Sequence, residues 1–197
     1  MREHIERIRF YLKIAGVTAI YRRYFVMNAF DGALTALGVV LGAWASGAIQ
    51  PRVIVGAGVG VSLAMGMSGF SGAYLAERAE RLRRLRELER SLLRSLERSV
   101  HSRALRTAIL WAAAVDALSP ALSSLTSISP FVAAQYGLIS VNEAAAASVI
   151  TVFAILFILG LFTGKVSREH MFISGLRMLI VGVSTAALIL LWTGYMG

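Results

Sequence analysis

An aspartate stands in the middle of a long apolar run near the start of this 197-residue chain. Asp31 lies within residues 24–44, a stretch long enough to cross a bilayer as a helix. A carboxylate among hydrocarbon chains is costly unless it is paired, hydrated or neutralised, so such a residue is by default a candidate functional group. Asp31 therefore points to the binding of a cation or a proton within the membrane.

Two neighbours of Asp31 could complete a metal site. Met27 and Asn28 precede it by four and three residues, so the three side chains share one side of a helix. A carboxylate, an amide oxygen and a thioether together suit a borderline divalent metal better than Mg2+ or Ca2+. The alternative is that Asp31 caps a broken helix or pairs with a buried arginine.

A second acid, Asp116, lies in another apolar run, four residues before Pro120. Because proline has no N–H, the carbonyl of Asp116 loses its helical hydrogen-bond donor, and this free carbonyl lies close to the carboxylate of the same residue. This pair of groups is a candidate ion ligand or proton acceptor, and an ion pair with Arg177 is the alternative. Met65 and Met67, in a glycine-rich run, are candidate soft ligands, although methionine in a membrane span more often serves packing.

Composition places these residues in an integral membrane protein. Hydrophobic residues make up 57% of the chain and charged residues 16%, against about 25% charged residues in soluble domains, and the mean hydropathy is +0.69. The absence of cysteine excludes disulfides, thiolate zinc sites and cysteine nucleophiles. No serine–histidine–aspartate set, phosphate loop or HExxH pattern is present, so no enzyme is expected. The net charge of +9 is attributed to topology and contact with anionic lipid, and no nucleic acid partner is expected.

Five apolar stretches predict an all-α integral membrane protein with five transmembrane helices. Residues 1–23 are expected to form a basic amphipathic helix on the membrane surface, with a solvated basic leader as the alternative. Residues 24–76 hold transmembrane helices 1 and 2, residues 77–107 a charged cytosolic helical segment, and residues 108–197 transmembrane helices 3 to 5. The expected spans are about 24–46, 53–75, 108–128, 143–164 and 171–196.

Two of the expected helix ends rest on single residues. Pro130 is expected to begin the turn after the third span, and Gly164 is suited to cap the fourth. Orientation rests on lysine and arginine, of which six stand in residues 1–23 and ten in residues 77–106, whereas the opposite side has only Arg52. Because cytoplasmic loops carry the excess of these residues, the N-terminus is predicted to be cytosolic and the C-terminus outside or luminal.

The charged segment is most simply the second span continuing into the cytosol, or a helix folded onto the membrane face. Glu77 and Glu80 each precede an arginine by four residues, the order that favours pairing along a helix. Such a charge run is usually a solvated face. The carboxylates of Glu77, Glu80 and Glu87 could also collect metal as hard oxygen ligands, although arginines outnumber glutamates here.

Motifs in three parts of the chain resemble those of the vacuolar iron transporter family. Asp-Gly-Ala-Leu-Thr-Ala-Leu-Gly-Val-Val-Leu-Gly at residues 31–42 is similar to the family's first-span motif. Ser-Gly-Phe-Ser-Gly-Ala-Tyr at residues 68–74 resembles its Ser-Met-Ala-x-Gly-Glu-Tyr in the second span. Residues 159–164 and 174–182 look like its fourth and fifth spans.

The resemblance implies a homodimer of five-span subunits that carries Fe2+, often Mn2+, out of the cytosol in exchange for protons. It makes Asp31 a translocation ligand. The family's second-span methionine ligand falls on Gly69, where Met65 one turn earlier could substitute, and its glutamate falls on Ala73. The family's best-known members also have a long glutamate-rich domain between spans two and three, whereas the corresponding segment here is short and rich in arginine.

The sequence therefore predicts a multi-pass transporter, in a cell membrane or a vacuole-type organelle membrane, that exports Fe2+ or Mn2+ by proton antiport. Asp31 would be the central ligand. No cofactor is expected, because the metal is the substrate, and the expected partners are membrane lipid, divalent metal ions, protons and a second copy of the chain. Two alternatives remain open: the same fold carrying another solute by proton coupling, and a non-transporting scaffold whose arginine-rich helix binds anionic lipid or a cytosolic partner.

Overall fold

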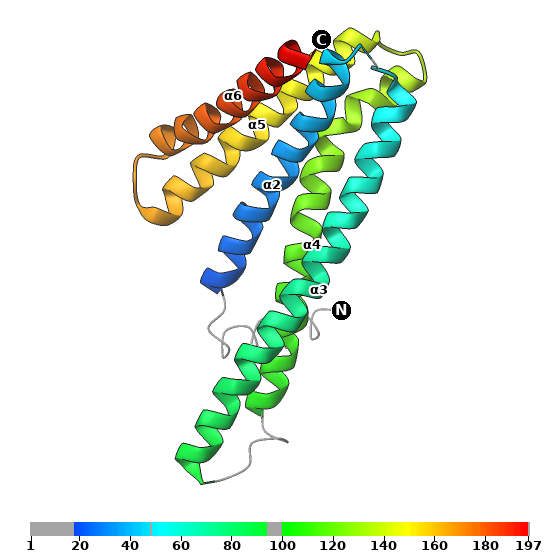
Figure 1. The fold of residues 1–197 in the computed structure, drawn as a ribbon. Coiled ribbons are helices and arrows are strands. Elements are labelled where there is room, and N and C mark those ends of the chain that lie inside the picture. The colour runs from blue at the N-terminus through cyan, green and yellow to red at the C-terminus, as the bar shows by residue number, and fades with distance from the viewer. Residues whose placement is uncertain (1–17, 48, 94–99, 197) are drawn as a thin grey trace. The chain divides into compact units, whose positions relative to one another are not determined.

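The computed structural model describes residues 18–47, 49–93 and 100–196, and most of these residues lie in helices joined by short turns. The first 17 residues of the predicted surface helix lie outside these ranges. Within the described residues there is no strand, and each of the five helices is long and apolar enough to cross a membrane, which confirms the predicted all-α, five-span fold. The helices are α2 (Thr18–Ala45), α3 (Pro51–Leu92), α4 (Val100–Gln135), α5 (Val141–Ser167) and α6 (Met171–Met196) (Figure 1).

The charged segment belongs to the same helix as the second span. α3 runs without a break for 42 residues, from Pro51 to Leu92. Of the two forms expected for this segment, the continuing helix is therefore the one found as far as Leu92. The orientation of the helices across a membrane stays a prediction.

The expectation for Pro130 is wrong, because this proline lies inside α4, which runs on to Gln135. Proline cannot donate a hydrogen bond to the carbonyl four residues earlier, here that of Thr126. The hydroxyl of Ser129 donates to that carbonyl instead, at 2.8 Å. The helix therefore continues past the proline, and the turn comes at Gly137, whose φ of +73° suits glycine.

The ends of α5 show a second difference from expectation. The helix begins in a capping box, in which the Ser140 hydroxyl accepts from the Glu143 N–H at 3.2 Å and the Glu143 carboxylate accepts from the Ser140 N–H at 2.7 Å. It ends at Arg168, whose backbone is left-handed at φ 58° and whose N–H bonds to the Gly164 carbonyl. Gly164 is therefore not the cap of α5. A glycine at this position is better explained by its close packing against α6.

Glycines let α5 and α6 approach closely. A Cβ at Gly160 would lie 2.5 Å from the Cα of Gly175, and a Cβ at Gly164 would lie 2.8 Å from the Cα of Met171. Backbone approach of this kind is common between membrane helices. Much of α6 is exposed nevertheless, including Trp192 at 68%, as expected for a helix that contacts lipid or another chain.

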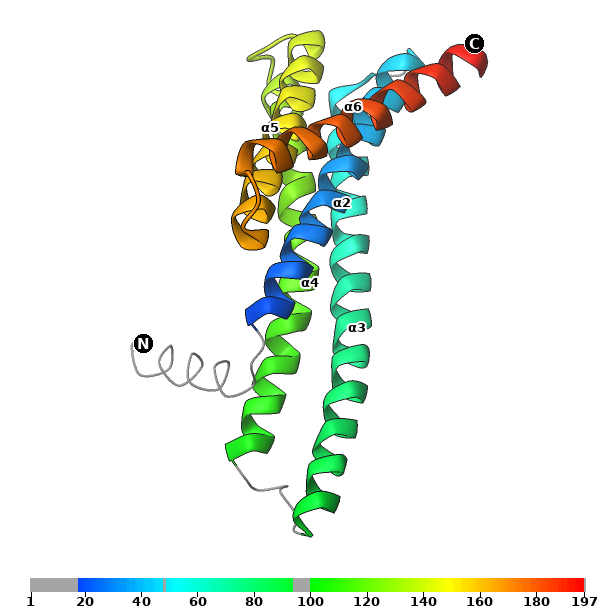
Figure 2. The ribbon, with the colours of Figure 1, turned by 90° about the vertical axis from the view of Figure 1, so that its left-hand side faces the viewer.

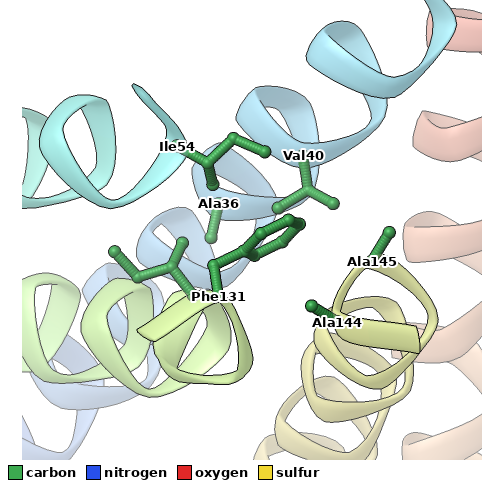
Figure 3. Packing of buried hydrophobic residues seen from close by; sticks show 7 residues of the cluster. Ala36, Val40, Ile54, Phe131, Ala144 and Ala145 are labelled. Atoms are coloured by element: carbon green, nitrogen blue, oxygen red, sulfur yellow. The ribbon is translucent and has the colours of Figure 1, made fainter. Parts of the chain in front are cut away.

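The described residues form two compact units. Unit 1 contains the residues before Val26 together with Gly66–Leu118, and unit 2 contains Val26–Met65 and the chain from Ser119 onward. In unit 1 the second half of α3 lies beside the first half of α4 (Figures 1 and 2). In unit 2 the fully buried ring of Phe131 lies at the centre of a core drawn from α2, α3 and α5, namely Ala36, Val40, Ile54, Ala144 and Ala145 (Figure 3).

Candidate functional site

Asp31 lies deep within its span. It is the eleventh residue of the 25-residue span Tyr21–Ala45, so it stands about 15 Å along the helix, in a hydrocarbon layer about 30 Å thick. Its side chain is exposed on the surface of the single chain. A carboxylate exposed at this depth would contact lipid unless water or another chain covers it.

Gly32, next to Asp31, brings α2 directly onto α4 in unit 2. Gly32 is buried, and a Cβ at this position would lie 2.7 Å from the Cα and 2.8 Å from the carbonyl carbon of Pro120. Any larger residue would force the two backbones apart. Only glycine at position 32 allows α2 and α4 to approach this closely, and the Asp-Gly pair therefore places the acid of Asp31 beside a close contact between two helices.

Unit 2 contains three of the five other residues predicted to form the metal set with Asp31, and the fifth, Asp116, belongs to unit 1. Met27 is 50% exposed, Asn28 and Met65 are half-buried, and the fourth, Met67, belongs to unit 1 and is 67% exposed. Met27 and Asn28 lie on the same side of α2 as Asp31 by their spacing. Among the described residues no three histidine, cysteine or acidic side chains gather into a metal-binding group. A metal at Asp31 would therefore depend on other ligands, such as amide oxygen, thioether or groups of a second subunit.

Asp116 packs on Gly69 of α3 in unit 1. A Cβ at Gly69 would lie 2.9 Å from Oδ2 of Asp116 and 3.0 Å from its carbonyl oxygen. The carboxylate and the carbonyl therefore face the same point of α3, as their position before Pro120 suggests, and only glycine leaves room for both. Arg177, the alternative partner of Asp116, forms an ion pair with Glu169 at 3.1 Å.

The three candidate acids of the charged segment each pair with an arginine four residues away. The pairs of Glu77 and Glu80 follow the predicted spacing. Because arginine occupies these carboxylates, the structure offers no support for metal collection by this segment. The three ion pairs are Glu77–Arg81 at 2.7 Å, Glu80–Arg84 at 2.9 Å and Glu87–Arg83 at 3.1 Å.

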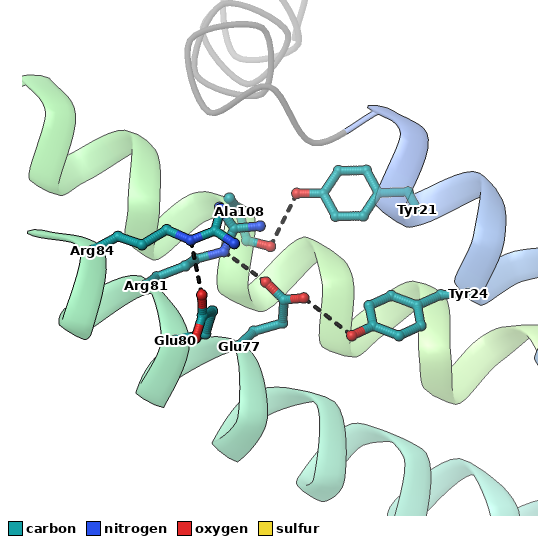
Figure 4. Close-up of polar contacts among 7 residues, drawn as sticks. All are labelled: Tyr21, Tyr24, Glu77, Glu80, Arg81, Arg84 and Ala108. Carbon is teal, nitrogen blue, oxygen red and sulfur yellow. Dashed lines mark hydrogen bonds and ion pairs between the residues drawn. The ribbon is translucent and has the colours of Figure 1, made fainter.

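The Glu77–Arg81 pair is buried, whereas the other two are exposed. The Arg81 and Glu77 side chains are 6% and 10% exposed. The Tyr24 hydroxyl donates to Oε1 of Glu77 at 3.1 Å, and the Tyr21 hydroxyl donates to the Ala108 carbonyl at 3.1 Å (Figure 4). The two tyrosines thus join the start of α2 to α3 and α4 in unit 1. The spacing of Glu77 and Arg81 predicted their ion pair, but it did not predict the contacts of the two tyrosines, which stand three residues apart on one side of a helix.

Buried hydroxyl groups line part of the interior of unit 2. Ser123 and Ser124 of α4 and Ser148 of α5 are buried, and their hydroxyls have no hydrogen-bond partner among the described residues. Buried polar atoms are normally satisfied. A hydrogen bond to a buried water would satisfy each of these hydroxyls.

Comparison with known proteins gives two matches. The family model of the VIT family matches residues 89–193, just over half of the chain. The chain is also 36% identical over 170 residues to an uncharacterized protein of Methanocaldococcus jannaschii, a match that covers 84% of this chain and 85% of that protein. The second similarity therefore extends over most of both chains.

Proposed function

This chain belongs to the vacuolar iron transporter (VIT) family, and we propose that it exports a divalent transition metal, Fe2+ or Mn2+, from the cytosol in exchange for protons. The family and the five apolar helices make it a multi-pass membrane protein of a transporter family. The observation that carries the finer proposal is the carboxylate of Asp31 within the apolar span of α2.

A single carboxylate can couple the two fluxes. A metal binds the ionised carboxylate and a proton binds the same oxygens, so each displaces the other. Asp31 would release metal where protons are abundant and take up metal after it has lost the proton. Met27, Asn28 and Met65 would add softer ligands in unit 2, and Asp116, with Met67 in unit 1, would provide a further ion or proton site.

A homodimer would cover Asp31. Gly38 and Gly42 follow Asp31 by seven and eleven residues, which places all three on one side of α2. A Cβ at either glycine would meet nothing within 4 Å in the described part of the chain. Small residues at this spacing commonly receive another helix in membranes. A second copy placed on this side would shield the acid from lipid and could supply further ligands.

The proposal is tested by Mn2+ flux into proteoliposomes with an imposed pH gradient. We expect gradient-dependent flux in the wild type and its loss in Asp31→Asn, which keeps the size of the side chain and removes the ligand charge. Glu169→Gln is the matched control, because it removes an acid exposed outside the helices. Full flux in a folded Asp31→Asn protein would show that Asp31 is not the ligand.

One observation favours a second candidate, the same fold carrying another solute by proton coupling. The charged segment is poorly suited to bind a cation, because arginines form ion pairs with the carboxylates of Glu77, Glu80 and Glu87. A thermal-stability screen separates the two candidates. Stabilisation by Fe2+ or Mn2+ that depends on Asp31 supports metal transport, and no effect of these metals supports the other solute.

A further inference from the structure

A pocket of about 400 Å³ lies in unit 1 between α3 and α4. This volume falls within the range of about 300–1,000 Å³ that is usual for small-molecule sites. The pocket has a charged part and an apolar part, and neither has a role in the proposed transport. Its lining consists of Tyr74, Arg78, Leu82, Arg106, Ile109 and Leu110.

The charged part carries two uncompensated arginines. Arg78 and Arg106 are exposed, and neither forms an ion pair with any described residue. The neighbouring arginines 81, 83 and 84 are neutralised by glutamates instead. Two guanidinium groups from different helices around one pocket favour an anion, and the planar guanidinium matches the oxygens of a phosphate group.

The apolar part of the pocket is accessible from the surface. Leu82 is 39% exposed and Leu110 is 54% exposed, one on each helix. Exposed leucines beside unpaired arginines suit a ligand that carries both an anionic group and a hydrocarbon chain. A small hydrophilic anion would leave this apolar surface uncovered.

The position of the pocket along the helices fits the level of lipid head groups. Arg78 follows the last apolar residues of the second span by about one turn, and Arg106 stands just before the apolar run of α4. Tyrosine and arginine at the ends of membrane helices commonly lie at the interface between hydrocarbon and water. This end is the one predicted to face the cytosol, where the membrane leaflet is rich in anionic lipid.

We propose that this pocket binds an anionic phospholipid, with the phosphate held between Arg78 and Arg106 and the acyl chains along Leu82 and Leu110. The lipid would bridge α3 and α4 where their apolar parts end. The site is separate from Asp31, and so its test does not depend on the transport proposal.

Native mass spectrometry of the full-length protein in detergent tests this site. The protein is titrated with phosphatidylglycerol or with phosphatidylcholine of the same chain length. We expect preferential retention of phosphatidylglycerol, reduced about 25-fold in Arg78→Gln/Arg106→Gln, since each arginine near an anionic surface contributes about fivefold. The matched control is Arg86→Gln/Arg90→Gln, which removes two exposed arginines of α3 that do not line the pocket.

Four results would overturn the proposal. Equal losses in the two double variants would indicate a diffuse surface charge, and equal retention of both lipids would indicate no phosphate selectivity. Inorganic phosphate that displaces phosphatidylglycerol at equal concentration would show that the ligand is a free anion. Arg106→Gln alone leaves α3 unchanged and is expected to lose about fivefold, so that a wild-type affinity in this variant would also contradict the site.

Discussion

Replacing Glu77 by glutamine is expected to destabilise unit 1, because the change leaves the charge of Arg81 buried without a counter-ion. Arg81 is 5% exposed, and its Nε lies 2.7 Å from Oε2 of Glu77. Removing one member of a buried ion pair costs about 3–5 kcal/mol. Glutamine still offers an acceptor to the Tyr24 hydroxyl, 3.1 Å from Oε1, so we expect the lower end of this range, about 3 kcal/mol.

The neighbouring Glu80–Arg84 pair is a matched control. It lies on the same helix with the same spacing and the same order of charges, but its side chains are 52% and 63% exposed. Exposed pairs contribute about 0.2–1 kcal/mol, so Glu80→Gln should cost no more than that. The double variant Glu77→Gln/Arg81→Met removes both buried charges and should cost less than the sum of its single changes.

The free energy of unfolding can be measured by titrating SDS into mixed micelles while following tryptophan fluorescence, to which Trp111 of unit 1 contributes. We expect the loss of unfolding free energy in Glu77→Gln to be at least three times that in Glu80→Gln. Equal losses in the two variants, or a loss below about 1 kcal/mol in Glu77→Gln, would refute the account of a buried charge that requires its partner.

Two further predictions concern single side chains. Gly69→Ala places a Cβ 2.9 Å from Oδ2 of Asp116 and should lower the free energy of unfolding by about 1–3 kcal/mol and slow metal flux. The control is Gly72→Ala, because a Cβ at Gly72 meets no described atom within 4 Å. Equal stability and flux in the two variants would contradict the packing of Asp116 on Gly69. Ser140→Ala removes the hydroxyl that accepts from the Glu143 N–H and should cost about 1 kcal/mol in the same SDS titration, whereas no change would mean that the capping box is not stabilising.

The spans of this protein could be predicted because a membrane helix requires an uninterrupted apolar run of known length. The last span was expected at residues 171–196 and α6 occupies Met171–Met196. The predicted turn at Pro130 was wrong because the loss of a backbone hydrogen-bond donor is normally enough to end a helix. Here the Ser129 hydroxyl satisfies the carbonyl of Thr126, a compensation that depends on a side-chain rotamer and not on residue type alone.

The candidate site was predictable only along single helices. Helical periodicity places Met27 and Asn28 beside Asp31 whatever the rest of the fold does. Contacts between helices depend on rotation and depth, which no local pattern records. The packing of Asp116 on Gly69 and the hydrogen bond from Tyr24 to Glu77 therefore became visible only in the structure.

The most direct test of metal–proton exchange is to measure proton movement driven by metal alone. Proteoliposomes with equal pH on both sides and a pH-sensitive dye inside are exposed to Mn2+, while Mn2+ uptake is followed in the same vesicles. Metal–proton exchange at Asp31 predicts saturable proton counterflow that accompanies Mn2+ uptake, and both should disappear in Asp31→Asn. Mn2+ uptake without proton movement, or counterflow that persists in Asp31→Asn, would contradict exchange at Asp31.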